Sequence, residues 1–261
     1  MIDYSEINAK TWDMWAKNGC EWSVPISHEA YLAADERSFQ VFLTPCVPVP
    51  HEWFGGLQGK SLLGLASGGG QQMPVFAKLG AACTVFDYSE QQLAAERMVA
   101  AREGYAIQIV RGDMTKRLPF DDESFDLIFH PVSNCYVEDV SHVWSECFRV
   151  LRPGGRLLAG FDNGVNFLCE ENEPLKIVNR LPFNPLRMPR EILEAMLRNG
   201  EGVQFGHTME EQLGGQLSAG LVLKALYEDR DRPGGAEIGN YLPQYMATLA
   251  VRPAPGAGEL P

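Results

Sequence analysis

The sequence has 261 residues, of which 45% are hydrophobic and 21% are charged, so disorder of the bulk is excluded and one large or two small domains are expected. Lys and Arg number 22 against 34 Asp and Glu, a formal net charge of −12, and this sign argues against nucleic acid as a partner. No run of about 18 apolar residues occurs, so no membrane span is expected.

The six cysteines carry no metal signature. They form no C-x-x-C pair and no Cys/His cluster with zinc spacing. The first residues also lack the basic and apolar regions of a secretory signal. The sequence therefore predicts free thiols, a cytoplasmic location and no bound metal.

Residues 1–56 differ from the rest of the chain because they are rich in tryptophan. Trp12 and Trp15 have the spacing of one helical face. A second helix is expected over Glu29–Phe42, with Ser27 as its N-cap. We expect this region to be a helical cap, which either covers a hydrophobic edge or forms an aromatic lid over a ligand.

From residue 60 onward, strand patterns alternate with helix patterns. Helices are expected over Gln71–Leu79, from the cap Ser89 to about Arg102, and from the cap Asp139 to about Leu151. This alternation predicts a parallel sheet covered on both faces, with ligands at the carboxyl ends of its strands. The expected strands are Ser61–Ala66, Ala82–Phe86, Ala106–Val110, Phe125–His130 and Arg156–Gly160.

The alternation stops after the fifth strand. Residues 162–205 are rich in proline and are expected to be an insertion, with a helix from Pro189 to Arg198. Thr208 and Glu211 form a capping box for a further helix that ends near Gly220.

Two more strands are expected near the end of the chain, at Leu221–Tyr227 and Met246–Val251. An acidic loop rich in Gly and Pro joins them, so the pair could form an antiparallel edge of the sheet. Residues 253–261 are expected to be a flexible tail. The sequence therefore predicts a helical cap over residues 1–56, a main domain over residues 57–252 and this tail.

A glycine loop follows the first strand. Gly68–Gly70 let the backbone approach a ligand without Cβ clashes. The dinucleotide pattern G-x-G-x-x-G is absent, because Met73 stands where its last glycine would be. The P-loop pattern is absent too, because Gln71 follows the glycines. A tight strand–helix turn remains the structural alternative.

Carboxylates end the next two strands. Asp87 closes the second strand, where a carboxylate can accept hydrogen bonds from both hydroxyls of a ribose. Asp113 follows the third strand, where it can accept a hydrogen bond from an adenine amino group while Met114 packs on the ring.

With these features in order, the chain resembles the class I S-adenosylmethionine-dependent methyltransferases, of the small-molecule type related to the ubiquinone and menaquinone biosynthesis methyltransferases. The resemblance covers residues 60–160. It rests also on Leu-Pro-Phe-Asp-Asp-Glu-Ser-Phe-Asp at 118–126 and on Arg-Val-Leu-Arg-Pro-Gly-Gly at 149–155. It implies a Rossmann-like, doubly wound and mostly parallel α/β sheet of seven strands with an antiparallel last strand, and S-adenosylmethionine as cofactor.

The resemblance also implies a set of site residues. The cofactor would be bound by Ala66, Ser67, Gly68, Gly70, Gln72, Asp87, Tyr88, Gln92, Gly112, Asp113, Met114, His130 and Ser133. Candidates for binding the methyl acceptor are Trp22, His28, Asn134, Tyr136 and His207. Two departures stand out: Gly64 replaces the acidic residue usual in the family, and Ala66–Ser67 replace Gly-Cys.

The expected reaction is methyl transfer to a small molecule by in-line displacement, for which the protein mainly supplies proximity and alignment. A general base is needed only for a hydroxyl or acidic-carbon acceptor, and His28, His130 and His207 are the candidates. One alternative is a non-catalytic cofactor-binding or regulatory protein on the same fold. A nicotinamide oxidoreductase is a second alternative, which Met73 disfavours.

Overall fold

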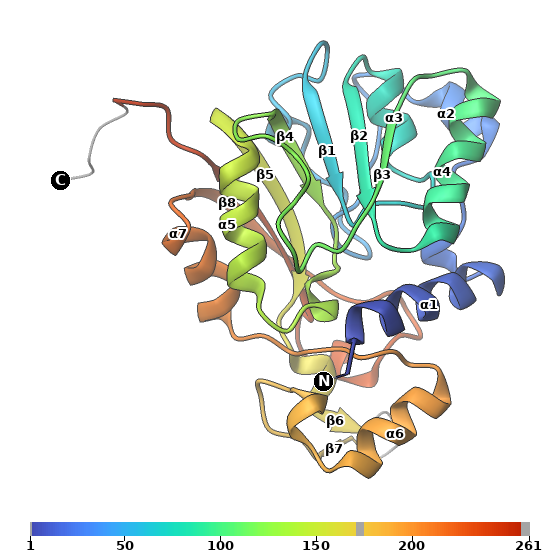
Figure 1. Cartoon of the computed structure of the whole chain (residues 1–261), viewed down its shortest axis with the longest axis vertical. Coiled ribbons are helices and arrows are strands. Elements are labelled where there is room, and N and C mark those ends of the chain that lie inside the picture. Colours follow the sequence, from blue (N-terminus) through green and yellow to red (C-terminus); the bar gives the residue numbers. More distant parts are fainter. Residues whose placement is uncertain (1, 171–174, 257–261) are drawn as a thin grey trace.

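A seven-stranded sheet forms the centre of the computed structural model, which describes residues 2–170 and 175–256. The strand order is β3-β2-β1-β4-β5-β9-β8 (Figure 1). The first five of these strands are parallel, β9 is antiparallel to β5, and β8 is antiparallel to β9. The Rossmann-like fold expected from the sequence is confirmed, including the antiparallel strands at its edge.

The strands lie close to their expected positions. They are β1 Ser61–Leu65, β2 Ala82–Asp87, β3 Gln108–Arg111, β4 Phe125–His130, β5 Leu151–Asp162, β8 Val222–Asp229 and β9 Tyr245–Val251. A separate two-stranded sheet pairs β6 Cys169–Glu170 with β7 Lys176–Ile177. β5 begins earlier than expected, because Leu151 already pairs with Phe125 ahead of a register shift.

Helices cover both faces of the sheet (Figure 1). They are α1 Tyr4–Lys17, α2 His28–Ala33, α3 Met73–Lys78, α4 Glu90–Glu103, α5 Val140–Val150, α6 Arg190–Asn199 and α7 Gly215–Ser218. Alternation along β1 separates two hydrophobic clusters. Leu62 joins α3, α4 and residues 39–57 on one face, and Leu63 joins α5 on the other.

Cap residues fix where the helices begin and end, as expected. Ser89 Oγ accepts from the backbone N–H of Gln92, and α4 ends at Gly104 in the left-handed conformation. Thr208 and Glu211 form the reciprocal hydrogen bonds of a capping box. The helix after this box starts as a π-helical turn, Glu210–Gly214, and continues as α7.

The helix expected over Glu29–Phe42 is wrong in its length. Ser27 caps α2 as expected, but the helix ends at Ala33. Phe39, Val41 and Leu43 are buried alternately, a period of two, because this segment packs on the sheet as extended chain. The N-terminal region therefore covers one face of the sheet with residues 39–57.

The carboxyl edge of the sheet faces α1 and the segment with β6, β7 and α6 (Figure 1). This segment contains the insertion expected over residues 162–205, of which 171–174 lie outside the described residues. Most of the tail expected over 253–261 lies outside them too. Among the described residues, no helix is long and apolar enough to cross a membrane.

Candidate active site

A cavity of about 1570 Å³ lies at the carboxyl ends of the parallel strands, where the fold predicts a ligand site. The loops after β1, β2, β3 and β4 line it, together with α1, the end of β5 and the β8–β9 loop. The cofactor candidates that line the cavity are Ala66, Ser67, Gly68, Gln72, Asp87, Tyr88, Gln92, Gly112, Asp113, Met114 and Ser133. The acceptor candidates that line it are Trp22 and Tyr136.

Asp87 connects two of the loops around this cavity. Its Oδ2 accepts from the backbone N–H of Gly68 at 3.0 Å, and its Oδ1 accepts from that of Ser89 at 3.0 Å. Burial raises the pKa of the carboxyl, while these N–H groups act in the opposite direction. The strand-end carboxylate is thus held in one orientation at the cavity wall.

The glycine loop lies close to Asp87 and Gln92. A Cβ added to Gly68 would lie 2.8 Å from Gln92 Cβ and 3.0 Å from Asp87 Oδ2. Gly69 has φ +99°, and its added Cβ would lie 2.7 Å from Gln92 Oε1. Glycine is therefore required here by the close approach of α4 and β2.

The two departures from the family pattern have structural consequences. Ala66 has φ +50°, a left-handed conformation that glycine adopts more easily. A Cβ added to Gly64 would lie 2.4 Å from Met73 Sδ. Met73 thus occupies the space that an acidic side chain at position 64 would need.

Glu96 holds the glycine loop from beneath, and the sequence analysis missed it. This fully buried side chain accepts from the Gly70 N–H through Oε2 at 2.9 Å and from the Tyr105 hydroxyl through Oε1 at 3.0 Å. Burial raises its pKa to about 7. Gly70 itself does not line the cavity. The available signal was an acidic residue spaced three residues from both Leu93 and Val99 on the buried face of α4.

The end of β3 forms another part of the cavity wall. Asp113 Oδ1 accepts from the Thr115 N–H at 2.8 Å, which fixes the carboxylate in a turn. A Cβ on Gly112 would lie 2.4 Å from the Phe86 ring, so this turn packs tightly on β2. The Arg111 guanidinium lies 4.9 Å from the centre of the Tyr88 ring.

α1 closes another side of the cavity. Asp13 Oδ1 accepts from Ser89 Oγ at 2.6 Å and from the Gln91 N–H at 3.0 Å, which fastens α1 to the start of α4. Trp12 packs edge-on against Tyr136, with ring centres 5.7 Å apart. The N-terminal region thus also contributes aromatic side chains to the cavity wall.

The β8–β9 loop reaches the same cavity through Arg232, which the sequence analysis did not single out. Its guanidinium pairs with Glu21 and lies 4.5 Å from the centre of the Trp22 ring. All three residues line the cavity. Two segments more than 200 residues apart in the sequence therefore meet at its wall.

His130 and Asn134 are buried behind the cavity wall and do not line it. The His130 ring contacts the Leu65 carbonyl oxygen through Nδ1 at 3.0 Å and Asn134 Oδ1 through Nε2 at 2.9 Å. Asn134 Nδ2 donates to Gln212 Oε1 at 3.0 Å. Burial lowers the pKa of His130, while its contacts with Leu65 and Asn134 act in the opposite direction. These contacts join β1 to the loop after β4.

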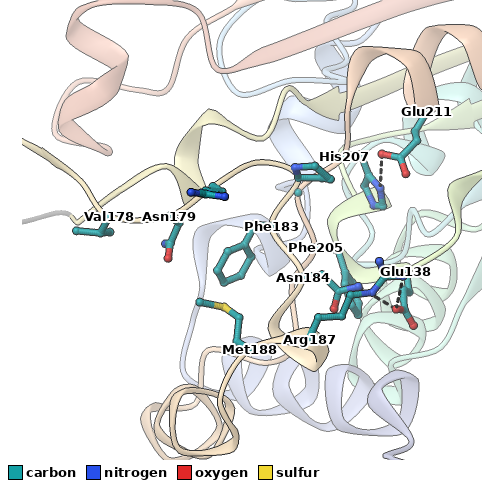
Figure 2. Close-up of a pocket in the computed structure, with 13 residues that line it drawn as sticks. Glu138, Val178, Asn179, Phe183, Asn184, Arg187, Met188, Phe205, His207 and Glu211 are labelled. Carbon is teal, nitrogen blue, oxygen red and sulfur yellow. Dashed lines mark hydrogen bonds and ion pairs between the residues drawn. The ribbon is translucent and has the colours of Figure 1, made fainter.

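The other two candidate histidines, His28 and His207, lie outside the large cavity as well. His28 is on α2, with Nδ1 2.9 Å from Glu103 Oε2. His207 is buried, and its Nε2 lies 2.9 Å from the Val137 carbonyl oxygen. Figure 2 shows His207 in the wall of a smaller cavity of about 400 Å³, to which Phe183 also contributes.

The large cavity fits S-adenosylmethionine. Ser67 and Gln92 line it, and Ser67 Oγ and Gln92 Oε1 are buried without a hydrogen-bond partner in the described part of the chain. A polar group of a ligand that reaches these atoms would complete their hydrogen bonding. Asp87 and Asp113 add carboxylates at neighbouring strand ends. No group of three or more His, Cys, Asp and Glu among residues 2–170 and 175–256 is placed to hold a metal ion.

Comparisons with known proteins agree with this geometry. A family model described as "Methyltransferase domain" matches residues 63–159. The uncharacterized methyltransferase YbaJ of Bacillus subtilis is 40% identical over 250 residues, which cover 94% of this chain and 97% of that protein. Demethylmenaquinone methyltransferase of Mycobacterium marinum is 40% identical over 119 residues, which cover 45% of this chain and 44% of that enzyme.

Solved structures give the same fold. An S-adenosylmethionine-dependent methyltransferase from Mesorhizobium loti has a TM-score of 0.59 at 22% identity, covering 75% of this chain and 92% of that one. Together with the long match to YbaJ and the strand-end residues around the cavity, this shows which family the chain represents. The protein belongs to the class I S-adenosylmethionine-dependent methyltransferases, and S-adenosylmethionine is its cofactor.

Proposed function

We propose that this enzyme transfers the methyl group to a small molecule held in the same cavity as the cofactor. The observation that carries the proposal is the size of that cavity. Its volume of about 1570 Å³ exceeds the roughly 300–1,000 Å³ of an ordinary ligand pocket. It extends from the glycine loop to side chains of the 162–205 segment, so it has room for a cofactor and an acceptor side by side.

The strand-end residues would hold the cofactor. Asp87 has lone pairs left for the ribose hydroxyls, because it accepts a single backbone N–H at each oxygen in the observed geometry. Asp113 and Met114 would contact the adenine, and Ser67 with Gln92 would contact the polar groups nearer the methionine part. The roles of Asp87, Asp113, Met114 and Ser67 follow the family pattern. All five assignments stay predictions.

The chain's own contribution to the reaction is alignment and exclusion of water. S-adenosylmethionine supplies an activated methyl group on a positively charged sulfur. α1, Trp22 and Arg232 line the cavity. Exclusion of water by these residues and the bound acceptor would favour a displacement in which this sulfur loses its charge. The three histidines considered as bases lie outside the cavity wall, so none of them is placed to accept a proton from the acceptor.

The proposal includes a cytoplasmic location, which the free state of all six cysteines supports. It also excludes nucleic acid as acceptor, because Arg232 is the only basic side chain among the described residues that line the cavity.

The test is transfer of isotope-labelled methyl groups into a bacterial cell extract separated by size. We expect label in the small-molecule fraction with the wild-type enzyme and with Glu36→Ala, which changes an exposed residue away from the cavity. Asp87→Ala should reduce the labelling at least about tenfold at limiting cofactor, the scale of one lost charged hydrogen-bond pair. Label in the protein or RNA fraction instead would contradict the proposal.

A further inference from the structure

Asp162, the last residue of β5, is a candidate for an additional ligand contact. Its side chain is 3% exposed and lines the large cavity. Oδ1 accepts from the Gly164 N–H at 2.9 Å, whereas Oδ2 is buried and has no hydrogen-bond partner among the described residues. A buried carboxylate oxygen without a hydrogen-bond partner destabilises the folded protein. Its presence here is explained if a ligand donates the missing hydrogen bond.

The strand order separates Asp162 from the residues proposed to hold the cofactor. β1 and β4 lie between β2, which ends at Asp87, and β5. At about 4.8 Å per strand, the two carboxylates belong to strands about 14 Å apart. In the β4–β5 register His130 pairs with Ala159, so Asp162 stands three residues farther along toward the cavity. It therefore lies on the acceptor side.

The charges around the cavity restrict the acceptor. Its acidic lining residues are Glu21, Asp87, Asp113, Asp162, Glu201, Asp231 and Glu237. Among the described lining residues the only basic one is Arg232, which is already paired with Glu21. A carboxylate or phosphate ester would find no free cation here, whereas a group that is or becomes positive is favoured by this field. Tyr136 and Tyr245 also line the cavity, and aromatic rings attract such a group.

We propose that the acceptor is an amine and that Asp162 Oδ2 binds its methyl-accepting nitrogen. This rests on the function proposed above and specifies its substrate class. The amine first releases its ammonium proton to solvent water. The lone pair of the resulting neutral nitrogen then forms the bond to the methyl carbon, the carbon–sulfur bond breaks, and its electron pair stays on sulfur. The nitrogen acquires the positive charge beside Asp162, which stabilises it. The ammonium product keeps its proton until it is released.

The sign of the charge that develops favours nitrogen over oxygen. A phenol or alcohol would develop negative charge as it loses its proton, in a cavity whose described lining already holds seven carboxyl groups and one guanidinium. An amine develops positive charge during the same step, and this is the sign that Asp162 and its neighbours stabilise.

The test is calorimetric titration of the protein loaded with S-adenosylhomocysteine, so that no turnover occurs. The probes are phenethylamine, phenethyl alcohol and phenylpropanoic acid, which differ mainly in the polar group. We expect the amine to bind most tightly, and Asp162→Asn to weaken amine binding at least about tenfold. The Asn oxygen can still accept from Gly164, so this variant should fold, and Asp231→Asn is the matched control at another lining carboxylate.

Asp231→Asn is expected to change amine affinity less than about threefold, because it alters only the surrounding field. Equal or tighter binding of the alcohol or the acid, no binding of the amine, or an unchanged affinity in Asp162→Asn would overturn the inference. Failure of S-adenosylhomocysteine to bind the wild-type protein would instead overturn the function proposed above. Binding of S-adenosylhomocysteine together with preferential binding of the alcohol or the acid would leave that function standing and reject the amine.

Discussion

The two halves of the cavity are built differently. On the cofactor side, Asp87 is held by backbone N–H groups of two adjacent strand-end loops, and Glu96 supports the glycine loop from below. On the side that we propose for the acceptor, Asp162 Oδ2 has no hydrogen-bond partner among the described residues, and the wall is assembled from α1, the β8–β9 loop and the 162–205 segment. We propose that the first half is a preorganised cofactor site and that the second half holds the methyl acceptor.

The largest expected effect concerns Glu96 on the cofactor side. Because burial raises its pKa from 4.5 to about 7, the folded protein binds more protons than the unfolded chain between these values. The free energy of unfolding should therefore fall by about 3 kcal/mol as pH rises from about 4.5 to about 7. Urea unfolding across this range measures the fall.

Glu96→Gln should remove most of this pH dependence above pH 6. Asp162, whose pKa burial raises to about 6, contributes in the same direction at lower pH, so Asp162→Asn is the matched comparison. Identical pH profiles for the wild type and Glu96→Gln would show that Glu96 does not carry the proton uptake.

The next effect concerns the contact between α1 and the start of α4, which connects the two halves of the cavity. Asp13→Ala removes the acceptor of two hydrogen bonds, from Ser89 Oγ and from the Gln91 N–H at the start of α4. We expect the free energy of unfolding to fall by about 2 kcal/mol. Lys10→Ala, on an exposed part of the same helix, should change it by less than about 0.5 kcal/mol. If thermal unfolding showed equal effects of the two changes, the hydrogen bonds of Asp13 would not stabilise the contact between α1 and α4.

A smaller effect is expected at the mouth of the acceptor side. Arg232→Ala frees the β8–β9 loop from Glu21 and Trp22. The KM for the acceptor should rise about fivefold, roughly 1 kcal/mol, with cofactor affinity unchanged. Arg230→Ala, in the same loop but bonded to the Gly239 carbonyl, is the control. A matching loss of cofactor affinity in Arg232→Ala would show that the halves are not separate.

The smallest effect concerns the departure at Ala66. Ala66→Gly should raise the free energy of unfolding by up to about 1 kcal/mol, because glycine adopts a positive φ without the Cβ clash. Ala94→Gly, at an exposed position of α4, should lower it by about 1 kcal/mol. Chemical denaturation measures the free energy of unfolding of both variants. A loss of stability in Ala66→Gly would show that Ala66 is not strained at this turn.

The sequence could predict the site residues that follow regular strands, but not those whose roles depend on contacts between distant segments. Gly68, Asp87 and Asp113 were predictable because each follows a strand of a short, regular alternation, and parallel strands bring their ends together. Glu96 was missed because its role depends on the contact between α4 and the glycine loop. Arg232 was missed because its partner Glu21 lies in a distant segment, and Asp162 was missed because the cavity that it lines is assembled from distant segments.

Histidines attracted attention because of their chemistry, yet folding placed all three candidates away from the cavity wall. His130 directly ends β4, as Asp87 ends β2, but its ring turns into the buried network with Leu65 and Asn134. Sequence position at a strand end therefore did not determine which way a side chain points. Burial and hydrogen bonding in the folded chain decided it.

The most direct test of this account measures the affinity for S-adenosylhomocysteine in Asp87→Ala and Asp162→Asn by calorimetry. The account predicts at least about tenfold weaker binding in the first variant and a change of less than about twofold in the second, because the two carboxylates serve different halves of the cavity. Unchanged affinity in Asp87→Ala, or an equal loss in both variants, would contradict it.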